Sequence, residues 1–140
     1  MRYWDASALA PLLVSEEGSN ASLEWLEQDG QIVTWLWTRA ELASAIERRT
    51  REGSLSRLQR RQVLARLDSL AESWDEVADA VAVRSRAINL LARHPIRAAD
   101  AGQLGAALLV HDHVAGPLGF VCLDRKLALA AELEGLQVLP

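Results

Sequence analysis

Four acidic side chains stand where a short apolar segment ends or a helical segment begins: Asp5, Glu41, Asp100 and Asp124. In an α/β protein with parallel strands, ligand sites form at the carboxyl edge of the sheet, so we expect these carboxylates to converge there. A pair about 4 Å apart repels by about 4 kcal/mol at an effective dielectric constant of 20, so the cluster needs a proton or a divalent cation. The cation alternative makes the chain a candidate metal-dependent phosphodiesterase.

Each of these acids also has a purely structural interpretation. Asp5 precedes Ser7 in a D-x-S pattern, in which Asp5 either binds a cation beside the Ser7 hydroxyl or caps the following helix. Thr38 and Glu41 form a T-x-x-E pattern, which is typical of a capping box. Asp100 would be favourable simply as an acid in the first turn of a helix. Asp124 would serve equally well as a helix cap or in a surface ion pair. Their shared placement at one expected edge is what favours a common site.

The donor types restrict the choice of metal. Carboxylate oxygens with open positions suit Mg²⁺ or Mn²⁺ better than zinc, and two such ions would activate water and stabilise the leaving oxygen in phosphodiester hydrolysis. The run His111-Asp112-His113 is a possible zinc site, but it lacks a second Cys/His pair at ligand spacing, so a solvated helix end is favoured. Cys122 lies in an apolar run and is expected to be a buried core residue.

The apolar patterns predict alternating strands and helices. Strands are expected at residues 2–5, 31–35, 119–123 and 136–139, with a break or short extended piece at 74–77. Helices are expected at residues 7–15, 19–29, 38–52, 56–73, 78–93, 98–110 and 125–134. Strands separated by helices predict an α/β fold with a short parallel sheet that helices flank on both faces. Right-handed crossovers would place the carboxyl ends of all strands on one edge.

Helical spacing also predicts which side chains face the core. Leu23 and Leu26 of the second helix, and Val81 and Ile88 of the helix at residues 78–93, are expected to point inward. Trp35 and Trp37 are expected on one side of a strand, packed in the core or with one of them exposed on a partner surface.

The bulk composition agrees with one small domain. The 140 residues are half hydrophobic and carry a formal net charge of −4, and the apolar runs are too short for a transmembrane helix. No secretory signal is expected, and the single Cys122 forbids an internal disulfide, so we expect a cytoplasmic protein.

Four segments together resemble PIN-domain proteins, and more closely the VapC-type toxins of bacterial toxin–antitoxin pairs: MRYWDASALAPLL, TRAELASAI, IRAADAGQLGAALL and FVCLDRKLALAA. The resemblance spans nearly the whole chain in the right order. It implies a single Rossmann-like PIN domain over residues 1–140. It also implies that the four acids named above hold Mg²⁺ or Mn²⁺, with Asp5 and Asp100 as principal ligands and Ser7 as the hydroxyl residue of the opening motif.

The same resemblance implies an activity and partners. The implied activity is endoribonucleolytic cleavage of structured RNA such as tRNA or rRNA. The implied partner is a small cognate antitoxin that inhibits this activity. The resemblance also implies a homodimer, which surplus apolar helix faces support as well. Two positions depart from the family pattern. Cys122 stands where a hydroxyl residue is frequent, which affects the positioning of Asp124, and Gly102 replaces a larger apolar residue, which concerns helix packing.

Charge is unevenly distributed along the chain. Residues 39–66 hold eight arginines against three acids, whereas residues 68–79 hold five acids and no base, and Lys126 is the one lysine among fifteen basic residues. Arginine offers a planar fork that suits phosphate, although a GC-rich genome would also favour arginine codons. We expect the arginine-rich stretch to face RNA or an acidic partner segment.

Two other functions are compatible with these patterns. A non-catalytic PIN-like module would use the acidic pocket for partner binding alone. A phosphoacceptor receiver domain would also be parallel α/β with aspartates at strand ends, but it needs paired acids early in the chain, and Asp5 has no acidic neighbour.

Overall fold

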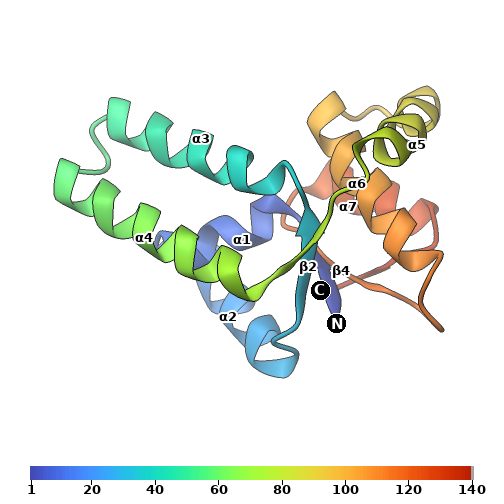
Figure 1. Ribbon diagram of the computed structural model, residues 1–140, viewed down its shortest axis with the longest axis horizontal. Coiled ribbons are helices and arrows are strands. Elements are labelled where there is room, and N and C mark those ends of the chain that lie inside the picture. The colour runs from blue at the N-terminus through green and yellow to red at the C-terminus, as the bar shows by residue number, and fades with distance from the viewer. Residues whose placement is uncertain (140) are drawn as a thin grey trace.

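The computed structural model describes residues 1–139, and helices lie on both sides of a central sheet (Figure 1). Five parallel strands form this sheet in the order β3-β2-β1-β4-β5. The strands are β1 (Arg2–Trp4), β2 (Ile32–Trp35), β3 (Asp75–Val77), β4 (Gly119–Val121) and β5 (Gln137–Val138). The helices are α1 (Ala6–Leu13), α2 (Ser19–Gln28), α3 (Thr38–Arg51), α4 (Arg57–Ser73), α5 (Ala80–Arg93), α6 (Ala98–His111) and α7 (Arg125–Leu133). The predicted α/β fold with a short parallel sheet is confirmed.

Strand β1 lies at the centre of the sheet, between β2 and β4. Tyr3 pairs in register with Val33 on one side and with Phe120 on the other. Because every neighbour is parallel, the segments that follow β1, β2 and β4 all leave the sheet at the same edge. Asp5, the start of α3 and the start of α7 therefore reach that edge together.

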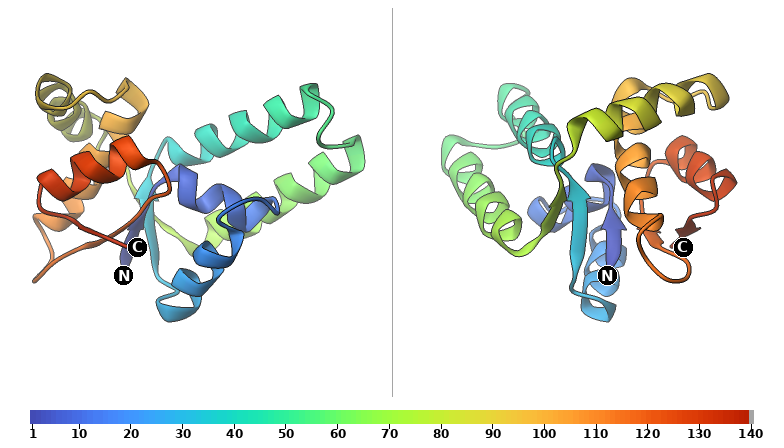
Figure 2. Two further views of the ribbon diagram at one scale, coloured as in Figure 1. Left: turned by 180° about the vertical axis from the view of Figure 1, so that it is seen from behind. Right: turned by 45° about the vertical axis from the view of Figure 1, so that its right-hand side comes forward.

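Two hydrophobic cores cover the two faces of the sheet. Tyr3 and Phe120 stack with ring centroids 5.6 Å apart and pack with α5, α6 and α7. The alternate residues Trp4, Ile32 and Val121 point to the opposite face, where helices α1 to α4 cover them. The two layers are visible on either side of the sheet in Figure 2. This two-sided burial explains why the strands lack an alternating polar pattern.

In two helices, the face that packs against the core differs from the one that helical spacing predicted. In α2 the buried side chains are Ser22 and Trp25, and Leu23 is 49% exposed, because the Ser22 hydroxyl donates a 2.9 Å hydrogen bond to the Ala8 carbonyl. The expectation that Leu23 points inward was therefore wrong.

Helix α5 shows the same kind of difference. Val83 and Leu90 are buried, whereas Val81 and Ile88 lie on the exposed face, contrary to expectation. The reason is a close approach to α6: a Cβ built on Gly105 would lie 3.2 Å from the Val83 carbonyl oxygen. That contact turns the side of α5 that carries Val83 toward α6.

Helices α3 and α4 form an antiparallel hairpin that projects from the sheet, and we call it the arm (Figure 1). Its two helices are held together by a buried apolar seam that includes Leu42, Ile46, Val63 and Leu67. Gly53 adopts a positive φ of 83° in the connecting loop, a conformation that glycine accepts without strain. Ser56 and Gln59 then start α4 with a capping box.

Among residues 1–139, no helix combines the length and the apolar character that crossing a membrane requires.

Candidate active site

Asp5 is the most deeply placed of the four predicted site residues. It follows the central strand β1, caps the N-terminus of α1 and is 5% exposed. Its Oδ2 atom accepts hydrogen bonds from the backbone N–H of Ser7 at 3.1 Å, from the Ser7 hydroxyl and from the Cys122 thiol, whose Sγ lies 3.6 Å away. The helix-cap interpretation of Asp5 is thus correct, and it leaves the Oδ1 atom available for other ligands.

Ser7 ties the start of α1 to the segment after β4. Its hydroxyl oxygen donates to Asp5 and accepts the backbone N–H of Leu123 at 2.9 Å. The backbone N–H of Asp5 in turn donates to the Val121 carbonyl at 3.0 Å. The opening D-x-S pattern therefore positions the loop that leads to Asp124.

Cys122 lies between Asp5 and Asp124. Its thiol lies 3.6 Å from Asp5 Oδ2 and 3.4 Å from the Asp124 carbonyl oxygen. Burial, and next the negative charge of Asp5, raise the pKa of the Cys122 thiol well above its ordinary value. The thiol therefore stays neutral and serves as a donor to Asp5, as the hydroxyl residue frequent at this position would.

Glu41 lies in the first turn of α3, but the predicted capping box is absent. The helix begins after Trp37, and the Thr38 hydroxyl points inward to the Thr34 hydroxyl at 2.8 Å. Glu41 instead accepts a 3.0 Å hydrogen bond from the side-chain amide of Gln103. The capping-box prediction was wrong because interior partners on β2 and α6 draw both side chains away from the helix end.

Electrostatic coupling shows that three of the acids lie close together. Burial raises the pKa of Glu41 to about 7, opposed by the Gln103 hydrogen bond and reinforced by the charges of Asp5 and Asp100. Burial is also the main reason that the pKa of Asp5 is raised, and Asp100 adds repulsion. Negative charges that raise the pKa of Glu41 and Asp5 favour a bound cation at this edge.

Asp100 and Asp124 line the open side of the site. Asp100 Oδ2 accepts the backbone N–H of Arg97 at 3.2 Å in the first turn of α6, and Asp124 Oδ1 caps α7 through the N–H of Leu127 at 2.9 Å. Both acids border a cavity of about 400 Å³ whose other charged lining residues are Arg97, Arg125 and Lys126. A cavity with two carboxylates and three cationic side chains suits a phosphodiester near a metal ion.

A buried chain of hydrogen bonds, which no sequence motif indicated, supports this edge. The Tyr3 hydroxyl donates to Gln103 Oε1 at 2.7 Å, and Gln103 Nε2 donates to the Thr38 hydroxyl at 2.9 Å and to Glu41. Gln103 is 1% exposed. A lone amide in the Ala/Gly/Leu-rich sequence of α6 was the available signal, since a buried polar side chain requires partners.

Gly102 packs against Trp35 at the end of β2. A Cβ built on Gly102 would lie 3.4 Å from the indole Nε1 of Trp35, so the ring lies in contact distance of the glycine. Trp35 is half-buried, whereas Trp37 is 62% exposed at the start of α3. This departure from the family pattern therefore accommodates a bulky indole beside the first turn of α6.

The four acids offer oxygen donors without converging on one point. Across the described residues 1–139, no three His, Cys, Asp or Glu side chains come close enough together to hold an ion. Each of the four carboxylates nevertheless makes its side-chain hydrogen bonds within this range through a single oxygen. The remaining four oxygens are the hard, anionic donors that Mg²⁺ and Mn²⁺ prefer, so the donor set fits such an ion.

The other predicted metal candidate has local partners. At the end of α6, Asp112 pairs with Arg86, and His113 Nδ1 lies 2.7 Å from the Leu109 carbonyl oxygen.

A family model described as the PIN domain matches residues 2–115. The chain belongs to the PIN-domain family. The match includes Asp5, Glu41 and Asp100 and ends before Asp124. No curated protein matches the chain.

Two solved structures show the same fold. One is described as a toxin–antitoxin complex from Klebsiella pneumoniae, with a TM-score of 0.64 and 15% identity. The other is described as the crystal structure of FitAcB from Neisseria gonorrhoeae, with a TM-score of 0.69 and 17% identity. Each similarity covers 100% of this chain and 97% of the other. The Rossmann-like architecture expected of a PIN domain is confirmed.

Proposed function

We propose that this PIN domain is a metal-dependent endoribonuclease and the toxin of a type II toxin–antitoxin pair in the cytoplasm. PIN domains are generally nucleases, which supports hydrolase activity. The observation that carries the proposal is that Asp5, Glu41 and Asp100 each keep a spare oxygen at the carboxyl edge of the sheet, where Asp5 and Asp100 repel the charge of Glu41. RNA of the tRNA or rRNA class is the proposed substrate.

The residues of the site divide the work. Asp5 and Asp100 would be the principal ligands of Mg²⁺ or Mn²⁺, with Glu41 and Asp124 completing the site. The ion supplies an activated water and charge stabilisation when bound. Ser7 holds Asp5, and Gln103 holds Glu41. Arg97, Arg125 and Lys126 would bind the substrate phosphate at the cavity mouth.

Removing the metal tests this proposal directly. Purified protein is incubated with structured RNA and Mn²⁺, with or without EDTA, and the products are separated on a gel. Cleavage is expected with Mn²⁺, to stop in EDTA and to return with excess Mn²⁺. Cleavage that persists in EDTA would indicate a contaminating metal-independent ribonuclease. A clean protein that binds RNA but never cuts it would instead support the non-catalytic partner-binding module.

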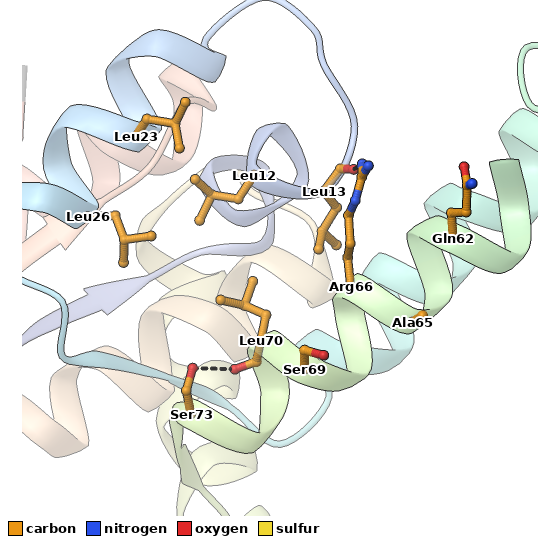
Figure 3. A pocket seen from close by; sticks show the side chains of 10 residues that line it. All are labelled: Leu12, Leu13, Leu23, Leu26, Gln62, Ala65, Arg66, Ser69, Leu70 and Ser73. Carbon is orange, nitrogen blue, oxygen red and sulfur yellow. Dashed lines mark hydrogen bonds between the residues drawn. The ribbon is translucent and has the colours of Figure 1, made fainter.

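We propose that the antitoxin binds in an apolar groove between α1, α2 and α4. It encloses about 540 Å³ and is lined mainly by leucines: Leu12, Leu13, Leu23, Leu26 and Leu70 (Figure 3). Arg66 and Gln62 border it, and Arg66 donates to the Leu13 carbonyl at 3.2 Å. An amphipathic helix of the partner would place its apolar face here. The Klebsiella neighbour, described as a toxin–antitoxin complex, supports a partner of this kind.

A charged substitution in the groove tests the partner site. Leu23→Glu is expected to weaken binding of the cognate antitoxin by about tenfold or more, as measured by calorimetry, because it buries a charge in the contact. Leu129→Glu, at a leucine of α7 that is 57% exposed against 49% for Leu23, is the matched control and should bind as the wild type does. Equal losses in both variants would contradict the groove as the binding site.

We also propose a homodimer through the exposed apolar face of α5. Val81, Ile88 and Leu91 lie on that face with no covering segment within residues 1–139. In sedimentation the wild type should be a dimer and Ile88→Glu a monomer, and a monomeric wild type or a dimeric Ile88→Glu would contradict this surface.

A further inference from the structure

The tip of the arm concentrates positive charge far from the carboxylates. Residues 47–61, which form the end of α3, the connecting loop and the start of α4, contain six arginines and two glutamates in a chain whose net charge is −4. Figures 1 and 2 show that this tip is the part of α3 and α4 farthest from the sheet. The charge is therefore local, and it is opposite in sign to that of the whole chain.

Only part of this charge is neutralised. Arg49 pairs with Glu16, and Arg60 pairs with Glu47, its Nε lying 2.8 Å from the carboxylate. Arg57 and Arg61 are exposed, and no carboxylate within residues 1–139 pairs with either of them. Both border a hollow of about 310 Å³ together with Arg60 and Thr50. The hollow thus presents two unpaired guanidinium groups beside a paired one.

The position of these arginines in α4 is unfavourable for the arm itself. Arg57, Arg60 and Arg61 lie in the first turns of the helix, where the partial positive charge of the helix dipole repels cations. The buried apolar seam of the arm does not require them. An anion in the hollow would be attracted both by the guanidinium groups and by the start of the helix.

The tip is also separated from the carboxylates by a definite length of helix. Arg51 lies ten residues after Glu41 in α3, which at a rise of 1.5 Å per residue is about 15 Å. Phosphates follow one another at about 3.4 Å per strand along a nucleic-acid duplex, so this distance covers about four base pairs. A ligand that reaches both places must therefore be a long or folded polyanion.

We propose that the hollow lined by Thr50, Arg57, Arg60 and Arg61 binds the phosphate backbone of an RNA whose scissile bond lies in the carboxylate site. The inference rests on the proposed function for the identity of the ligand. Bound at two separated places, a structured RNA is held by this protein more tightly than a fragment that reaches the carboxylates alone.

Binding is measured without catalysis, by fluorescence anisotropy of a labelled stem-loop RNA in EDTA over a series of KCl concentrations. Arg57→Glu and Arg61→Glu are compared with Arg84→Glu, a matched charge reversal at an exposed arginine of α5. Each phosphate contact contributes about 0.9 to the slope of log affinity against log salt, so its loss costs about eightfold at 0.1 M relative to 1 M salt. Arg57→Glu and Arg61→Glu should each show this loss and a slope shallower by about one, and Arg84→Glu should not.

A second measurement separates this inference from the proposed function. Bis(p-nitrophenyl) phosphate reaches the carboxylates alone, so its Mn²⁺-dependent hydrolysis should be unchanged in the arm variants while their KM for RNA rises. If the wild type hydrolyses neither substrate, the nuclease proposal fails. The binding assay would still test whether the arm tip binds RNA.

Three results would overturn the inference: wild-type affinity and salt slope in both arm variants, an equal loss in Arg84→Glu, or no RNA binding by the wild type. Retained RNA binding with lost binding of a polyglutamate peptide would assign the tip to an acidic protein partner instead.

Discussion

Asn in place of Asp5 should reduce Mn²⁺-dependent RNA cleavage by at least about a hundredfold, since even residues that only orient metal ligands change activity by 10- to 100-fold. Asp5 is buried at the end of the central strand, where Asp100 raises its pKa and where its own charge raises the pKa of Glu41. Asparagine keeps the shape but removes the charge that an ion requires. The rate of cleavage and the affinity for Mn²⁺ should therefore fall together.

Asparagine is chosen because it preserves the structural role of Asp5. Asn also caps helices, so the hydrogen bond from the Ser7 N–H that starts α1 can persist. Removing a buried charge near Asp100 should also raise the free energy of unfolding in EDTA, as measured with urea. A protein that gains stability while it loses cleavage cannot have failed by unfolding.

The matched control is Asp75→Asn, at an exposed acid of β3 outside the site. Its cleavage rate and stability should remain those of the wild type. Wild-type cleavage by Asp5→Asn would exclude the carboxylate mechanism altogether.

The substitution Gln103→Leu is expected to have the largest effect on stability. It leaves the buried Tyr3 hydroxyl without its acceptor and Thr38 and Glu41 without a donor. Each buried polar group left without a partner costs about 1–3 kcal/mol, so we expect a loss of about 2–4 kcal/mol in urea unfolding. Mn²⁺ affinity should fall as well, because the Glu41 carboxylate loses the group that holds it.

A double-mutant cycle separates the hydrogen bond from simple packing. Tyr3→Phe removes only the hydroxyl, and in the Gln103→Leu background it removes a group that is already unsatisfied. The two losses should therefore sum to more than the loss in the double variant. Strict additivity would show that Tyr3 and Gln103 do not act as one unit.

The same variant changes the pH dependence in a defined direction. Burial raises the pKa of Glu41 in the folded state to about 7, above its ordinary value of 4.5, so the folded state binds the proton more tightly. Glu41 therefore lowers stability in EDTA as pH rises from about 4.5 to about 7. Gln103→Leu removes the hydrogen bond that opposes this shift and should move the end of that range upward. Glu41→Gln should abolish this part of the slope, and an unchanged slope would contradict the assignment.

The sequence predicted the fold well because its signals are local. Short apolar runs separated by helical segments predicted the α/β fold class. The acids at the boundaries of these segments were predicted to lie at one edge of the sheet. Even the short strand β3 was visible as an extended break. The buried face of α5 was predicted wrongly because it depends on the contact between Gly105 of α6 and the Val83 backbone of α5. Periodicity alone cannot show which partner a helix face will meet.

The site was predictable as a set of acids but not as a bonded network. Asp5 and Asp124 cap helices, as local patterns suggested. Glu41 did not join a capping box, because Gln103 reaches it from a helix that lies 62 residues later in the chain. Such long-range polar partners are selected by the packed fold.

The position of β1 between β2 and β4 makes the acidic edge depend on distant parts of the chain. Asp5 donates to the Val121 carbonyl and Ser7 accepts the Leu123 N–H, and each partner lies 116 residues later than the residue it fixes. The side chains that line the apolar groove between α1, α2 and α4, by contrast, all lie within residues 12–73. The groove therefore draws on a much shorter stretch of chain than the carboxylate site does.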